Sequence, residues 1–152
     1  MPDTETALKL IALDAEDLAV ISAHVQDSCV QRDEMTWLPA QKRFVLGVMR
    51  YDWSASGRGR HERVGAALRF DRVLKVVQIG LGEPDSPPML NLLAVGFEET
   101  DPPSGFVTLA FFGGAAVRLE VECLEGELRD IGPRVEAEAC LDHDAPPTRR
   151  RS

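Results

Sequence analysis

The sequence predicts an α+β domain that is mainly β, with about seven antiparallel strands, an N-terminal helix and a short C-terminal helix. Apolar residues alternate with a period of two through most of residues 35–123, which is the spacing of half-buried strands. Segments rich in glycine and proline interrupt this alternation at the spacing of hairpins. The clearest helical spacing lies near the N-terminus, over residues 15–26.

Length and composition are those of one globular domain. The chain has 152 residues, of which 44% are hydrophobic and 28% are charged. We expect the domain to span residues 8–133. A flexible N-terminus, 1–7, precedes it, and a flexible tail, 134–152, follows where the apolar residues thin out.

The charge and the cysteines bear on the compartment and on the partners. The formal net charge of −8 at pH 7 repels phosphate backbones and anionic lipids, which argues against nucleic acids and membranes as partners. Residues 1–7 lack the basic and apolar pattern of a secretory signal. The three cysteines, Cys29, Cys123 and Cys140, are odd in number and far apart, which favours reduced thiols. We therefore expect a cytoplasmic protein.

The N-terminal region predicts a short strand and then a helix. Residues 8–13 have the composition of a strand, and Asp14 is a good helix N-cap followed by acidic residues in the first turn. Over residues 15–26, apolar side chains recur at helical spacing. This stripe consists of Leu18, Ile21 and Val25.

The central region predicts a series of strands joined by turns. A hairpin is expected across Pro39-Ala40-Gln41-Lys42, and a loop rich in glycine and arginine is expected over residues 54–62. The expected strands cover residues 35–38, 44–53, 64–70, 73–79 and 90–97.

The strongest hairpin signal is Gly113-Gly114, between strands expected over 106–112 and 115–123. A two-residue glycine turn would place Phe112 opposite Ala115 and Phe106 opposite Val121. The core face would then carry Phe106, Thr108, Ala110 and Phe112. The opposite face would carry Val107, Leu109 and Phe111, which would need cover from the N-terminal helix or from a second subunit.

The C-terminal part of the domain predicts a short helix over residues 124–131. Leu124, Leu128 and Ile131 recur at i, i+4 and i+7, and Gly132-Pro133 would end the helix. Seven strands sealed by a helix suit a half-open barrel such as the pleckstrin-homology-like superfold. A curled sheet with helices on one face suits the pattern equally, and neither layout carries a function.

Several strings of residues distributed along the chain carry a family resemblance. They are residues 8–18, Arg43-Phe44, Arg50-Tyr51-Asp52-Trp53, Phe70-Asp71-Arg72-Val73, residues 118–123 and Asp130-Ile131-Gly132-Pro133. On these strings, the stretch from Leu8 to about Pro133 resembles the small bacterial proteins grouped as domain of unknown function 2948. The resemblance implies a bacterial cytoplasmic protein and supplies no activity.

One basic cluster stands out as a candidate contact for an anion or for RNA. Arg58, Arg60 and Arg63 alternate with small and polar residues in a glycine-rich segment, where guanidinium groups gather readily on a phosphate or carboxylate. Tyr51 and Trp53 lie just before the cluster and would be able to stack on a base. The competing interpretation is a solvated loop.

None of the remaining motifs predicts a reactive site. Gly80-Leu81-Gly82 ends a strand, but the prolines that follow forbid the helix of a dinucleotide-binding turn. Cys140-Leu141-Asp142-His143-Asp144 lacks the second ligand pair of a zinc site, and Cys123 is in phase with core residues. We assign no catalytic, cofactor-binding or metal-ligating residue.

The sequence therefore favours a non-enzymatic binding or protein-interaction module. A partner protein, or a second copy in a homodimer, would be bound through loops or through an open sheet edge. The alternative is a small-ligand-binding protein or an enzyme, with a pocket at the mouth of the barrel near Arg50, Tyr51, Asp52 and Trp53.

Overall fold

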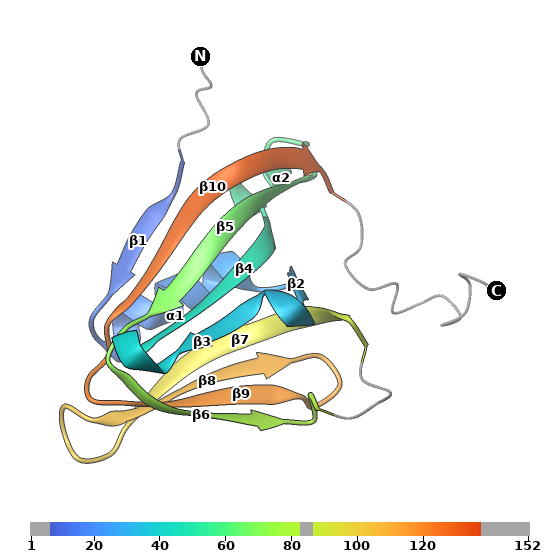
Figure 1. The fold of residues 1–152 in the computed structure, drawn as a ribbon. Helices are drawn as coiled ribbons and strands as arrows, with labels where there is room; N and C mark the ends of the chain where they lie inside the picture. Colours follow the sequence, from blue (N-terminus) through green and yellow to red (C-terminus); the bar gives the residue numbers. More distant parts are fainter. Residues whose placement is uncertain (1–6, 83–86, 138–152) are drawn as a thin grey trace.

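The computed structural model describes residues 7–82 and 87–137 as one curled, open sheet with two α-helices (Figure 1). The helices are α1 (Ala15–Val25) and α2 (Trp53–Ser56), and two short 3₁₀ turns are η1 (Arg32–Glu34) and η2 (Pro39–Gln41). The strands are β1 (Lys9–Ala12), β2 (Ser28–Gln31), β3 (Met35–Leu38), β4 (Arg43–Tyr51), β5 (Glu62–Phe70), β6 (Val73–Ile79), β7 (Met89–Glu99), β8 (Gly105–Phe111), β9 (Ala116–Val121) and β10 (Gly126–Glu136).

All paired strands are antiparallel, and they follow the order β1-β10-β5-β4-β2-β7-β8-β9-β6, with β3 paired to β4 beside this path. The sheet curls so that β10, β5 and β4 form one layer and β7, β8 and β9 form the other (Figure 1). α1 packs against β7, β1 and β4. The described residues thus contain ten strands where about seven were expected, and the curled sheet is the layout that they adopt.

The helix α1 confirms the N-terminal prediction. Asp14 caps it by accepting a 2.8 Å hydrogen bond from the backbone N–H of Asp17. All three residues of its predicted stripe, Leu18, Ile21 and Val25, are fully buried. Their burial against the inner face of the sheet explains why so short a helix is stable.

The β8–β9 hairpin is correctly located, but its predicted register is wrong by one residue. The backbone N–H of Phe111 bonds to the carbonyl of Ala115, so the loop has three residues and not two. Val107 then lies opposite Leu119, and Leu109 lies opposite Val117. This register buries the large apolar side chains of both strands on one face.

Consequently, the face predicted to be the core on β8 is the outer one. Val107, Leu109 and Phe111 belong to the core, whereas Phe112 is 50% exposed. Phe106 lies on the outer side, where the Arg118 guanidinium sits 3.9 Å from its ring centroid. The three residues expected to need cover are therefore core residues themselves.

The predicted C-terminal helix is wrong, because residues 126–136 form the strand β10 between β1 and β5. Gly132-Pro133 does not end the element. It forms a bulge across which the pairing with β5 shifts, between Asp130 and Arg134. The domain therefore continues past residue 133. The flexible ends predicted at 1–7 and 134–152 fall mostly outside the described residues.

Candidate functional site

Two of the predicted site residues, Arg50 and Tyr51, lie on opposite faces of β4. Side chains alternate along a strand, so Arg50 points to the buried inner face and Tyr51 to the outer face. Asp52 is also buried, and its carboxylate caps the short helix α2. Arg50 and Tyr51, both expected at the mouth of a barrel, therefore point to opposite sides of the sheet.

On the inner face, Arg50 forms a two-point salt bridge with Asp130 of β10. Its Nε and one Nη donate to the two carboxylate oxygens, each at 2.8 Å, and the two side chains are 5% and 4% exposed. The backbone N–H of Leu8 donates to the same carboxylate at 2.9 Å. The Arg50 charge is thus neutralised inside the fold.

A second charged group adjoins this pair at the same end of the inner face. Arg134 donates to the carboxylates of Asp52 and Glu62, at 2.7 and 2.8 Å. Burial alone would raise the pKa of Asp52. The hydrogen bonds from Arg134 and from the backbone of Ala55 outweigh burial and lower this pKa. Asp52 is therefore held as a carboxylate.

His24 of α1 lies near these charges. Burial lowers its pKa below the ordinary 6.5, and the nearby Arg50 charge lowers it further, against the opposing effect of Asp130 and Asp52. His24 is thus held neutral near pH 7. The inner cluster of Arg50, Asp130, Asp52, Arg134 and Glu62 is satisfied by its own partners, which is the arrangement of a structural network.

On the outer face, Tyr51 is the centre of a small aromatic cluster. Its ring meets Trp53 edge to face, with 4.6 Å between centroids, and its hydroxyl is 2.5 Å from Nδ1 of His61. Arg63 lies 5.8 Å from the Tyr51 ring and donates to the backbone carbonyls of Asp27 and Met49. Burial lowers the pKa of Arg63 from its usual value.

The basic loop is only partly brought together. Arg63 belongs to β5 and is buried, whereas Arg58 and Arg60 are exposed in the turn after α2. Trp53 is 46% exposed beside this turn. Arg63 is therefore tied to the fold, while Arg58 and Arg60 lie at the surface.

A groove of about 250 Å³ lies on the outer face of the sheet, across β10, β5, β4, β2 and the start of β7. It lies on the same face of β4 as Tyr51 and reaches Met49, two residues before Tyr51 in the strand. Its lining residues are Cys29, Gln31, Glu34, Gly47, Val48, Met49, Gly65, Ala66, Met89, Ile131 and Gly132. Sequence reasoning missed this groove, although a glycine in the middle of a strand, Gly47, is a recognisable signal.

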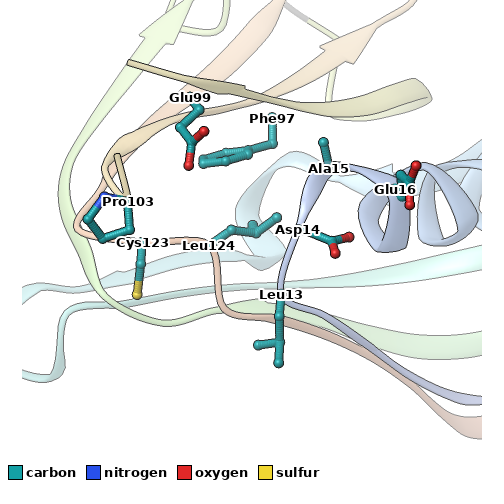
Figure 2. A pocket seen from close by; sticks show the side chains of 9 residues that line it. All are labelled: Leu13, Asp14, Ala15, Glu16, Phe97, Glu99, Pro103, Cys123 and Leu124. Atoms are coloured by element: carbon teal, nitrogen blue, oxygen red, sulfur yellow. The ribbon is translucent and has the colours of Figure 1, made fainter. Parts of the chain in front are cut away.

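A second cavity, of about 370 Å³, lies at the start of α1. Figure 2 shows Phe97 and Glu99 over the Asp14–Ala15 segment, with Leu124 between Cys123 and Asp14. Asp14 is engaged as the helix cap, and Cys123 is a half-buried free thiol. The prediction that Cys123 is a core thiol is therefore only partly met.

The expectation of reduced thiols holds at Cys123 but fails at Cys29, which is disulfide-bonded. Within residues 7–82 and 87–137, no group of three or more His, Cys, Asp or Glu side chains is placed to hold a metal ion. In the same ranges, no helix has the length and apolar character needed to cross a membrane.

The last candidate feature is the strand β6, which lies at the edge of the sheet and, among residues 7–82 and 87–137, pairs with no strand except β9. Its burial pattern leaves most of its side chains at the surface, including the apolar Leu74, Val77 and Ile79. These three side chains are 46%, 41% and 51% exposed. The strand was predicted correctly, but its position at an edge depends on the pairing of distant strands.

Comparison with known proteins identifies the family. The family model described as "Protein of unknown function (DUF2948)" matches residues 8–143, so the chain belongs to this family. Neither the curated proteins nor the solved structures include a match to this chain.

Proposed function

We propose that this member of the DUF2948 family is a non-enzymatic interaction module that binds an extended segment of a partner protein along the edge of β6. The observation that carries the proposal is the apolar, open edge of this strand. An edge strand presents backbone N–H and C=O groups that a partner strand is able to pair with.

The composition of β6 supports binding rather than protection. Many edge strands are protected against pairing with another chain by short length, charges, proline or bulges. β6 has seven residues, no proline and no acidic residue. Its one charge, Lys75, and its one register shift, between Val73 and Lys75, both lie in its first half, so the segment Val76–Ile79 is a regular apolar edge apart from Gln78. The opposite edge, β1, has four residues, so it offers a much shorter template.

The expected partner segment is apolar on one face and carries an acidic residue. Val77 and Ile79 lie on the outer face with Lys75, opposite Arg118 and Ala116 of β9. A partner strand would extend this apolar surface, and its acidic residue would form an ion pair with Lys75. A second copy of the chain is the competing occupant of the same edge.

The proposal is tested by comparing wild type with the double variant Val77→Lys/Ile79→Lys. Both positions are exposed, so the fold is retained, whereas two added charges on this edge block strand addition. The control is Leu93→Lys, which changes a 40% exposed residue on β7. Proteins captured from cells of the source organism are quantified for all three chains.

Support requires one stoichiometric protein that is retained by wild type and by the control and lost by the double variant. That protein, once purified, must also shift the NMR amide signals of β6. Equal retention by all three chains, or no stoichiometric protein, contradicts the proposal. Light scattering tests whether the edge is occupied by a second copy of the chain instead. If wild type is a dimer and the double variant is a monomer, the edge serves self-association.

We further propose that the protein acts in the bacterial cytoplasm, as its family resemblance implies. The cytoplasm keeps most thiols reduced, and the disulfide at Cys29 departs from that pattern. Fractionation of cells, with alkylation of thiols before lysis, tests this location. Recovery in the cytoplasmic fraction with alkylated Cys29 supports it, and recovery outside that fraction contradicts it.

A further inference from the structure

We propose that a basic patch on the outer face of β1, β10, β5 and β4 docks an acidic segment of a partner protein. The patch consists of Lys9, Arg43, Arg69 and Arg129, with two carboxylates, Asp71 and Glu127, between them. β1, β10 and β5 lie side by side (Figure 1), and β1 and β6 stand at the two ends of the strand order. The patch is therefore separate from the edge of β6 and does not depend on it.

The register of the strands brings these charges to one face of the sheet. Glu127 and Arg129 flank the buried Leu128, so they lie on the outer face of β10. Lys9 of β1 is directly opposite Arg129. Arg69 of β5 is directly opposite Glu127. Directly opposite residues are neighbours on the same face, so the four side chains form one surface.

The carboxylates of the patch are each shared between two guanidinium groups. Asp71 accepts a hydrogen bond of 2.7 Å from Nε of Arg43 and one of 3.1 Å from Nε of Arg69. Glu127 forms ion pairs with Arg69 at 2.7 Å and with Arg129 at 3.4 Å. Three arginines thus share two carboxylates. Arg43 and Arg129 keep guanidinium N–H groups that bind no described residue.

Lys9 adds a positive charge that the described fold does not balance. Its side chain is exposed, and its ammonium has no ion-pair partner within residues 7–82 and 87–137. Its directly opposite neighbour, Arg129, is a second cation. Like charges directly opposite each other lower the stability of a sheet. The fold gains nothing from this pair, whereas an external anion would account for it.

The sign of the patch is opposite to that of the whole chain. The patch has four cations and two carboxylates, whereas the chain has 17 lysines and arginines against 25 aspartates and glutamates. Guanidinium groups with unused donors bind carboxylates through paired hydrogen bonds. Charge complementarity therefore points to an anionic partner at this place on an acidic molecule.

A neighbouring apolar side chain favours a protein segment over a nucleic acid. Ile11 is 57% exposed and lies opposite Glu127, so it belongs to the same face as Lys9. An acidic protein segment is able to cover this side chain with an apolar residue, which a phosphate backbone lacks. The net charge of −8 also repels the many phosphates of a nucleic acid more strongly than a few carboxylates.

A carboxylate limits the patch toward the middle of β4. The Glu34 oxygen lies 3.1 Å from the position that a Cβ would take at Gly47. Gly47 is in the same cross-strand row as Arg129, with Ala67 between them. The acidic residues of the partner should therefore lie over β1, β10 and β5.

The test uses blocked hexaglutamate as the probe, hexaglutamine as its neutral counterpart and hexauridylate as the nucleic acid. Each is titrated into the ¹⁵N-labelled full chain at pH 7 and about 50 mM NaCl. Saturable amide shifts at Lys9, Ile11 and Arg129 are expected with hexaglutamate, with a Kd in the low millimolar range or tighter. Raising the salt to about 500 mM should weaken binding severalfold, because exposed ion pairs are screened.

Two double variants locate the binding surface. Lys9→Gln/Arg129→Gln should weaken hexaglutamate binding about three- to twentyfold, because it removes two exposed ion pairs. The matched control, Lys75→Gln/Arg118→Gln, removes two exposed cations from β6 and β9 and should change the affinity less than about twofold. If only the control weakens binding, the probe occupies the β6 side. That result overturns this inference and leaves the proposed function standing.

A stability measurement separates a docking role from a structural one. Lys9→Gln should leave the urea midpoint unchanged or raise it, because it relieves the like-charge pair with Arg129. A lower midpoint would show that the Lys9 charge stabilises the fold, and it would overturn the proposal.

The remaining outcomes that overturn the proposal concern other occupants or no occupant. They are a Kd weaker than about 10 mM, equal affinity for hexaglutamine, and tighter binding of hexauridylate. Shifts at the patch that depend on protein concentration without a probe would assign it to a second copy. A shift of the Arg129 amide in Asp3→Asn/Glu5→Gln without a probe would assign it to the acidic residues that precede β1 in the sequence.

Discussion

Arg50 and Asp130 join β4 to β10 across the intervening strand β5, through two hydrogen bonds of 2.8 Å in the interior of the molecule. The two residues are separated by 80 positions in the chain. Removing one partner leaves the other charge buried and unpaired, whereas replacing both by apolar groups does not.

Asp130→Ala is therefore expected to lower the free energy of unfolding by about 3–5 kcal/mol. The double variant Arg50→Met/Asp130→Leu should recover most of this loss, because no uncompensated charge remains. Urea denaturation at pH 7 measures both. A double variant that is less stable than Asp130→Ala would show that the pair is favourable in itself.

The two groove glycines should respond in opposite ways to alanine. Gly65→Ala forces a methyl group onto the Gly132 carbonyl and should cost about 1–3 kcal/mol, the range of overpacking. Gly47→Ala should be neutral or stabilise by about 0.5–1 kcal/mol, because it removes the cost of a glycine in a strand. Thermal unfolding of the two variants side by side provides the check, and equal losses would contradict it.

Asp52 should make stability depend on pH in the acid range. Its pKa in the folded protein lies below the ordinary 3.8, so its contribution is complete above that value and is lost as the pH falls through the folded pKa. Asp52→Asn lacks this contribution. The difference in unfolding free energy between wild type and Asp52→Asn should be constant from pH 7 to about 5 and shrink below about 4.

His24 should titrate below 6.5, because burial and the Arg50 charge disfavour its protonated form. The unfolded chain binds the proton first as the pH falls, so stability declines from about pH 6.5 downward through the folded pKa. NMR titration of the imidazole measures the pKa directly. In His24→Gln, the decline of the urea midpoint between pH 7 and pH 5.5 should be smaller, and an imidazole pKa above 6.5 would refute the assignment.

Most strands and the main helix follow from local patterns in the sequence. The stripe of α1 and its Asp14 cap lie within one short segment, and so do the alternating residues of β4 and β5. The alternation of β8 is equally clear, but both of its faces are apolar. The register then depends on loop geometry and on the burial of β9, which a local pattern does not determine.

The error at β10 has a related cause. Leu124, Leu128 and Ile131 match helical spacing, yet only Leu124 and Leu128 are buried. The inner face of β10 continues from Leu128 to Asp130, and a charged residue at a core position contradicts a strand pattern until its partner is known. The partner is Arg50, far away in the sequence.

The candidate sites were the hardest features to predict. Arg50 to Trp53 are adjacent in sequence and therefore looked like one site, but alternation sends Arg50 inward and Tyr51 outward. The groove combines residues from five strands and η1, and the open edge of β6 exists only because of the overall strand order. Neither feature has a local signature apart from Gly47.

The strand order also constrains how the protein is made. β10 inserts between β1 and β5, although the ribosome synthesises it after both of them. In a nascent chain shorter than about 130 residues, Arg50 therefore lacks its counterion Asp130, and β1 and β5 lack the strand that lies between them. Stable closure of this half of the molecule must await release of β10 from the exit tunnel, so folding is completed after nearly the whole domain has emerged.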